Sequence, residues 1–158
     1  MTTDLISHRR GRSVGAVVVG FLVAALLSVA TDVVVHASGV FPPWGEPMAD
    51  ALLVWATAYR IVFTVVGGYV TARVAPGRPM WHVTVLGALG TFAATVGAAA
   101  TWNAGPAFGP KWYPILLVAT ALPCTWAGGA LRVHLQRANQ TSDTRSTGDK
   151  RHECVRSC

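Results

Sequence analysis

The sequence predicts an all-α membrane protein, a four-transmembrane-helix bundle built from two helical hairpins. Of its 158 residues, 52% are apolar and only 13% are charged, about half the charged share of an average soluble domain. The charges concentrate near the two ends and in short connections, so four long stretches are almost uncharged. A helix needs about 20 mostly apolar residues to cross the hydrocarbon of a bilayer. Four such stretches leave no room for a soluble domain.

The predicted spans, in chain order, are residues 14–35, 49–74, 81–102 and 112–133. Asp32 is the one charge of the first span and lies near its far end. The second span has Asp50 at its start and Arg60 in its interior, and the third has no Asp, Glu, Lys or Arg at all. The few charges within the spans are therefore the places to look for a function.

The predicted membrane domain comprises residues 14–135. The segments on either side of it are polar. We expect residues 1–13 to form a cytoplasmic N-terminus and residues 136–158, which are rich in Ser, Thr, Arg and Asp, to form a disordered cytoplasmic tail. The first apolar stretch is longer than the 7–15 residues of a signal-peptide core and contains Asp32. It is therefore predicted to remain as an uncleaved helix.

Orientation follows from the positive-inside rule, because short cytoplasmic loops carry an excess of Lys and Arg. Eleven basic residues fall on one side of the predicted spans, and Lys111 alone falls on the other. The eleven are Arg9, Arg10, Arg12, Arg73, Arg78, Arg132, Arg137, Arg145, Lys150, Arg151 and Arg156. Both termini are therefore expected in the cytoplasm. The net charge of +6 reads as a topology signal, and no nucleic-acid partner is expected because no folded domain carries a basic surface.

Two similarities between the first and second halves of the sequence suggest the two helical hairpins. Gly67-Gly68 occurs in the second span and Gly128-Gly129 in the fourth. The two predicted outer loops, GVFPPWGEPM at 39–48 and GPAFGPKWYP at 105–114, both combine Pro, Gly and aromatic residues. We expect each loop to be a short, stiff cap.

Arg60 is the most informative single residue. About ten residues separate it from the outer end of its helix, which places it roughly 15 Å deep, near the middle of the bilayer. An arginine there costs about 2.5–3.5 kcal/mol on insertion scales. Asp32 is its obvious partner, with an axial gap of about 9 Å by helical rise. The sequence predicts an intramembrane charged pair, Asp32 with Arg60.

This pair has two interpretations. It can be a buried ion pair that fixes how the helices dock, or part of a polar path in which Arg60 contacts an anion or substrate. In a proton-coupled version Asp32 titrates and His36, one turn further along the same face, hydrogen-bonds it and supplies protons from outside. Asp50, near the interface, is expected to be solvated or to cap its helix. His36 and Asp50 are therefore accessory candidates.

The sequence gives no reason to expect an enzyme, a cofactor or a metal centre. It contains no phosphate-binding glycine loop and no nucleophile with a matching base and acid. The tail residues His152, Cys154 and Cys158 do not have the spacing of a standard zinc site.

The segments GVFPPWGEPM (39–48), ATAYR (56–60) and GGYVTARVAP (67–76), taken in this order, resemble uncharacterised small four-helix inner-membrane proteins of Gram-negative and related bacteria. The resemblance covers residues 14–135. It implies four spans and a bacterial plasma membrane, and it transfers no activity and no site residue.

Together these observations predict an integral membrane protein that acts as a structural or partner-interacting helical bundle. The alternative is a small oligomeric transporter or channel that uses Arg60 and Asp32. The expected partner is the lipid bilayer, with self-association or another membrane protein left open.

Overall fold

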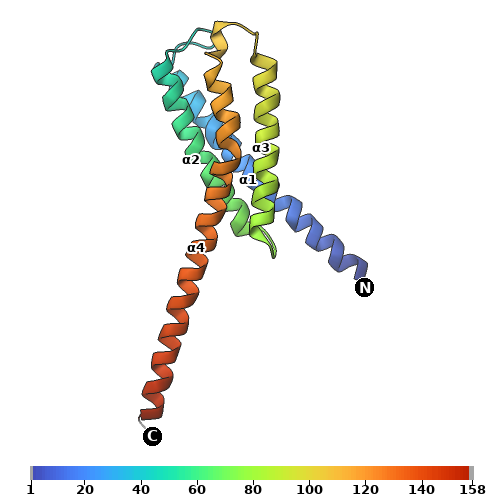
Figure 1. The fold of residues 1–158 in the computed structure, drawn as a ribbon, viewed down its shortest axis with the longest axis vertical. Coiled ribbons are helices and arrows are strands. Elements are labelled where there is room, and N and C mark those ends of the chain that lie inside the picture. The colour runs from blue at the N-terminus through green and yellow to red at the C-terminus, as the bar shows by residue number, and fades with distance from the viewer. Residues whose placement is uncertain (1, 157–158) are drawn as a thin grey trace.

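The described part of the chain folds into four helices and one short 3₁₀ turn. The computed structural model describes residues 2–156, with side chains described for 12–106 and 108–141. The elements are α1 (Thr2–Ala37), α2 (Asp50–Val74), α3 (Pro79–Thr101), η1 (Pro106–Phe108) and α4 (Trp112–Arg156) (Figure 1). Each of the four helices is long and apolar enough to cross a membrane.

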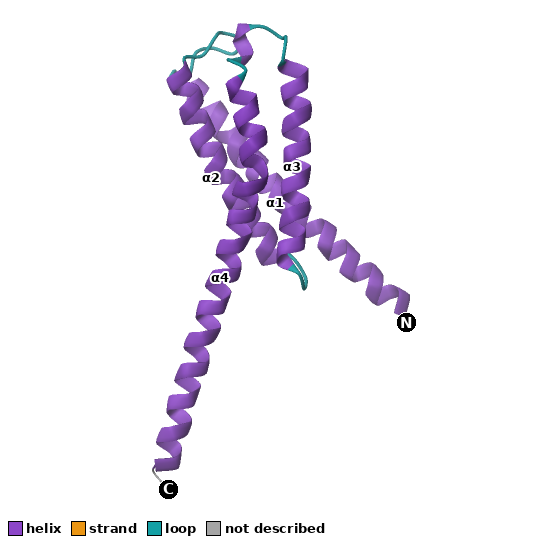
Figure 2. Ribbon diagram, in the orientation of Figure 1, coloured by secondary structure: helices purple, strands orange, loops and turns teal. Residues whose placement is uncertain are grey.

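The helical bundle has two distinct ends. The connections 38–49 and 102–111 meet at one end, here called the loop end (Figure 2). The connection 75–78 lies at the opposite end, together with the start of α1 and the extension of α4; this is the terminal end. Within the loop-end connections the backbone has positive φ at Gly39, Gly45, Gly105 and Gly109. These glycines make the tight turns that the two Pro- and Gly-rich segments predict.

Helix α4 is the centre of the packing. It packs along α2 on one side and along α3 on the other, whereas α1 packs mainly on α2 and less on α3. In Figure 1, α1 passes behind α3 near the terminal end and runs up behind α2. The contact between α1 and α4 is slight.

Three of the four residues in the two glycine pairs lie where helix backbones touch. A Cβ on Gly67 would lie 2.8 Å from the carbonyl oxygen of Gly20 on α1, and a Cβ on Gly68 would overlap the carbonyl of Thr125 on α4. A Cβ on Gly128 would in turn overlap the backbone of α2. Small residues at such positions let helices approach closely enough for van der Waals packing to hold them together without a hydrophobic effect.

Most of the apolar side chains point outward. The buried apolar core consists of Ala16, Phe41, Leu53, Ala56, Ala72, Val83 and Leu86. Large apolar residues elsewhere are exposed along every helix, for example Leu26 at 65% and Phe92 at 68%. A soluble monomer rarely exposes a continuous apolar surface larger than a few hundred Å².

Many of the threonine hydroxyl groups are satisfied within their own helix. Thr57, Thr71 and Thr125 are buried, and each donates a hydrogen bond to the carbonyl oxygen four residues earlier. The exposed Thr84 and Thr95 do the same. These hydroxyl groups therefore need no water as an acceptor, which suits side chains that face an apolar medium.

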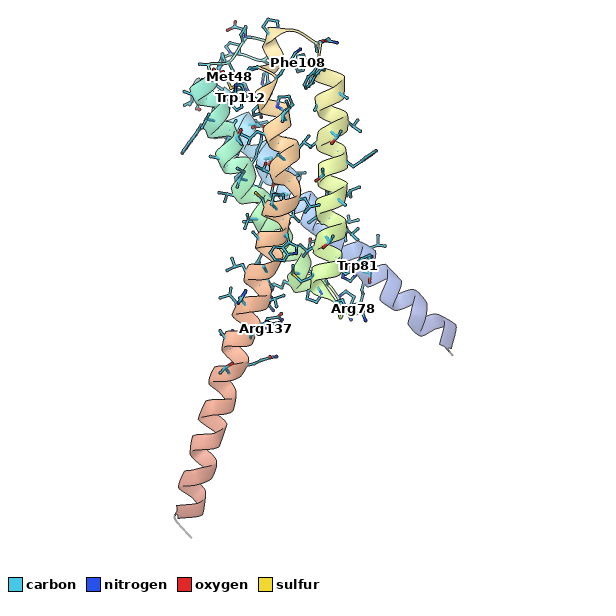
Figure 3. The ribbon with its side chains drawn as sticks, viewed as in Figure 1. Met48, Arg78, Trp81, Phe108, Trp112 and Arg137 are labelled. Atoms are coloured by element: carbon cyan, nitrogen blue, oxygen red, sulfur yellow. The ribbon has the colours of Figure 1, made fainter. Side chains whose placement is uncertain are left out.

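The two ends carry different side chains (Figure 3). Arg78, Arg137 and Trp81 lie toward the terminal end, whereas Phe108 and Trp112 lie at the loop end. Large aromatic residues therefore mark both ends, and the labelled arginines mark only one.

The fourth helix is longer than expected. The sequence predicts a span that ends at residue 133 and a disordered tail from 136, but α4 continues without a break through Arg156. The stretch after 133 contains no proline and a single glycine, Gly148, so its backbone meets no obstacle to helical hydrogen bonding. This part of α4 extends away from the other helices (Figure 1).

The close approach of α2 and α4 predicts how glycine substitutions affect stability. Gly128→Ala adds a methyl group against the Val65 carbonyl oxygen, and we expect it to lower the free energy of unfolding by about 1–3 kcal/mol through overpacking. Gly97→Ala is the matched control, because Gly97 is also within a helix but has nothing within 4 Å of its Cβ position. Equilibrium unfolding in detergent micelles, followed by circular dichroism, measures both. Equal stability of the two variants would contradict the packing described here.

Candidate functional site

The structure brings Asp32 and Arg60 together. Asp32 lies on α1 and Arg60 on α2, and the Arg60 Nη2 atom donates a hydrogen bond of 2.5 Å to Asp32 Oδ2. Their side chains are 17% and 32% exposed, respectively. The Arg60 side chain therefore covers the axial gap estimated from helical rise, and the charges neutralise one another inside the helical bundle.

A third residue, Tyr59, completes the site. Its hydroxyl group donates a hydrogen bond to the other carboxylate oxygen of Asp32, Oδ1. Asp32 therefore receives one donor at each oxygen, both from neighbouring residues of α2. The Tyr59 ring also lies 6.0 Å from the Arg60 guanidinium carbon and 5.8 Å from the Phe63 ring. We call Asp32, Tyr59 and Arg60 the α1–α2 network.

Sequence reasoning missed Tyr59. The charge of Arg60 points to Asp32 as its partner, but a carboxylate has two oxygens and one arginine nitrogen engages only one of them. Tyr59 adjoins Arg60 and carries a phenol that can donate to the second oxygen. A hydroxyl neighbour of an intramembrane arginine is the signal that would have identified it.

One face of α2 is largely buried. Leu53, Ala56, Thr57, Gly67 and Thr71 are all buried. On the opposite face Val54, Trp55 and Val62 are more than half exposed. At 3.6 residues per turn, Arg60 falls on the same side of α2 as these buried residues, the side that packs against other helices.

His36 is not a partner of Asp32. Its Nδ1 atom lies 2.7 Å from the carbonyl oxygen of Pro42, and its ring stacks on Trp44 with centroids 3.8 Å apart and packs edge-on against Phe41. The first loop folds back over the end of α1, because its Pro and Gly residues turn the chain sharply there, and this fold-back engages the imidazole. The proton relay from His36 to Asp32 therefore lacks its first hydrogen bond.

Asp50 is exposed and is the first residue of α2. No side chain caps this helix end with a hydrogen bond, so Asp50 acts there through its charge, which is favourable near the positive end of the helix dipole. Asp50 belongs to the surface of the loop end and not to the α1–α2 network.

Within the described side chains, no group of three or more His, Cys, Asp or Glu residues is arranged to hold a metal ion. Cys124 is a free thiol. The side chains of His152, Cys154 and Cys158 lie outside the described residues.

Comparisons with known proteins add no family. No protein-family model matches the chain, and neither the curated proteins nor the solved structures contain a significant match. The functional argument therefore depends on the geometry of this chain.

The network predicts a specific cost for losing the phenol. Tyr59→Phe keeps the ring contact with Phe63 but leaves Asp32 Oδ1 without its donor. We expect the free energy of unfolding to fall by about 1.5–3 kcal/mol, the range for a hydrogen bond to a charged group.

Tyr69→Phe on the same helix is the control. No hydrogen bond joins the Tyr69 hydroxyl to any described residue, so the free energy of unfolding should change little. Detergent unfolding of both variants provides the measurement. If Tyr59→Phe were as stable as the wild type and the Tyr69→Phe control, Asp32 would not depend on the Tyr59 hydroxyl.

Proposed function

We propose that this protein is an integral membrane protein whose four-helix bundle has a structural or partner-binding role. In this proposal the α1–α2 network fixes how α1 packs on α2. The single observation that carries this proposal is the network itself. Each oxygen of the Asp32 carboxylate is engaged by a donor from α2, as expected for a contact that holds two helices together. Its two donors are adjacent residues of one helix, so the network joins two elements and leaves no carboxylate oxygen without a donor.

Membrane insertion is supported by surface chemistry. The helices expose apolar side chains on their outer faces, their hydroxyl groups are satisfied locally, and aromatic residues lie toward both ends. All three features are compatible with a bilayer, whereas exposure of so many apolar side chains to water is unfavourable. We infer that the spans pair as two hairpins, α1 with α2 and α3 with α4, joined through the α2–α4 contact.

Orientation follows from the same charge asymmetry. Arg73, Arg78 and Arg137 belong to the terminal end, and Lys111 belongs to the loop end. By the positive-inside rule the terminal end faces the cytoplasm. The resemblance to small bacterial four-helix proteins supports the plasma membrane of a bacterium as the location.

The test of the docking role is a double-mutant cycle. Asp32→Ala or Arg60→Ala alone leaves one charge unpaired inside the bundle, and we expect each to destabilise the fold by about 3–5 kcal/mol. The double variant leaves no unpaired charge and should recover much of that loss. The amount of folded protein in the membrane, together with detergent unfolding, reports the effect.

Asp50→Ala is the matched control, because Asp50 is exposed and has no ion pair among the described residues; it should behave as wild type. The transporter alternative makes the opposite prediction. If each single variant folded normally while a solute-uptake phenotype disappeared, the docking role would be wrong.

Orientation has its own test. A fluorescent protein fused after residue 158 should fluoresce, because it folds in the cytoplasm, and alkaline phosphatase fused there should be inactive. Alkaline phosphatase inserted in the 102–111 connection should be active. An active phosphatase at the C-terminus would overturn the charge argument.

A further inference from the structure

A hollow opens between α1 and α3 at the terminal end of the bundle. Its volume is about 580 Å³, and its walls come from α1, from the 75–78 connection and from α3. This volume is within the range of small-molecule sites, about 300–1,000 Å³, and the hollow is open to the surroundings. No residue of the α1–α2 network lines it, so it is a separate feature of the molecule.

Polar and apolar residues follow one another along the depth of this hollow. Helices α1 and α3 both run from the terminal end toward the loop end (Figure 1), so residues with higher numbers lie deeper in the bundle. Ser13 and Arg78 begin the two walls, and we call this part the mouth. Val17 and Val85 lie about 6 and 10 Å deeper by helical rise, and we call this part the floor. The hollow therefore passes from a polar mouth to an apolar floor.

Arg78 is held at the mouth by its backbone. Gly77 has a positive φ of 83° and turns the chain sharply just before it. The Arg78 carbonyl oxygen accepts a hydrogen bond from the Trp81 N–H and lies 2.9 Å from His82 Nδ1. The Arg78 side chain is exposed and forms no ion pair with a described residue. A fixed backbone thus carries a positively charged side chain at the mouth.

The distribution of charge favours an anion at this end of the bundle. Among the described side chains, the acidic ones are Asp32, in the α1–α2 network, and Glu46 and Asp50, in the loop-end region. The terminal end carries exposed arginines, Arg73 and Arg78 among them, and no described carboxylate. A negatively charged group is therefore attracted to the terminal end and not to the loop end.

A phospholipid with an anionic headgroup matches this order of surfaces. A guanidinium group binds phosphate through charge and through paired hydrogen bonds, and an acyl chain covers the apolar floor. Trp81 lies beside Arg78 in the wall (Figure 3) and is 67% exposed, as suits an indole ring at the headgroup level. A soluble phosphate compound would leave the floor uncovered. A lipid with a choline headgroup would bring a further positive group to the arginines.

We propose that the hollow between α1 and α3 binds a phospholipid with a net negative headgroup, with its phosphate at Arg78 and an acyl chain along the floor formed by Val17 and Val85. This site rests on the membrane location proposed above, and it depends neither on the docking role of the α1–α2 network nor on the orientation of the chain.

The test adds lipid to the full chain in a nonionic detergent and follows the first bound lipid by native mass spectrometry. The probes are dioleoyl phosphatidylglycerol, which is anionic, and dioleoyl phosphatidylcholine, which has the same acyl chains and no net charge. We expect the wild type to bind phosphatidylglycerol about fivefold more tightly, the factor that one basic residue supplies at an anionic headgroup. Glycerol 3-phosphate, which has the phosphate without the chains, should not displace it at equal concentration.

Charge variants locate the phosphate. Arg78→Gln should abolish the preference for phosphatidylglycerol over phosphatidylcholine. Arg73→Gln is the matched control, because it removes the same charge from an exposed position at the same end but does not line the hollow; it should keep the preference.

Floor variants locate the acyl chain. Val85→Trp fills the floor and should lower the affinity for both lipids. Leu89→Trp is the control, because Leu89 is exposed on the next turn of α3 and does not line the hollow; it should bind as wild type. Circular dichroism and gel filtration establish that each variant folds.

Three results would overturn the proposal: equal binding of the two lipids by the wild type, displacement of phosphatidylglycerol by glycerol 3-phosphate at equal concentration, or the same loss of preference in Arg73→Gln as in Arg78→Gln. The first two are measured on the unaltered chain, so they stand even if a variant fails to fold. Membrane insertion is measured separately, by flotation of the chain with phosphatidylcholine vesicles in alkaline carbonate. A chain that floats but shows no lipid preference refutes the lipid site alone, whereas a chain that does not float refutes the membrane location.

Discussion

A guanidinium group in the interior of an apolar bundle must be neutralised and hydrogen-bonded, and the arrangement of α1 and α2 follows from this constraint. Arg60 is far from either end of α2, so its side chain cannot reach water at the helix ends. Asp32 supplies the opposite charge from α1, and Tyr59 supplies the donor that Arg60 does not. Breaking any one of these contacts leaves a polar atom unsatisfied in a place where nothing replaces it.

The direction of the Arg60 side chain makes this possible. Helix α1 touches α2 at Gly20 and Gly67, and by helical rise Asp32 lies about 18 Å along α1 from that point, whereas Arg60 lies only about 10 Å along α2. Side chains on a helix lean toward its N-terminus, which for α2 is the loop end. The long Arg60 side chain therefore extends in the direction needed to reach Asp32. Two contacts, one of glycine backbones and one of charges, thus set the register of α1 against α2.

Much of this fold was predictable from the sequence, because apolar length and helical period are local properties. The helices α2 and α3 lie within two residues of the predicted spans. The Asp32–Arg60 pair was predictable for a related reason, since few other charges lie within the spans. Tyr59 was missed because its role depends on the second oxygen of Asp32, which only the three-dimensional arrangement shows. His36 was misassigned because the fold of the Pro-rich loop, and not helical spacing, determines its neighbours.

The most direct test of the central claim is the distance between the Arg60 guanidinium and the Asp32 carboxylate in a bilayer. Solid-state NMR on protein labelled with ¹⁵N in arginine side chains and ¹³C at the aspartate carboxyl carbon measures their dipolar coupling, and an Arg60→Lys sample identifies the signal that belongs to Arg60. The account predicts a nitrogen–carbon distance of about 3–4 Å, as in a hydrogen-bonded pair, that is lost in the lysine sample. A wild-type spectrum with no coupling between these groups would contradict it.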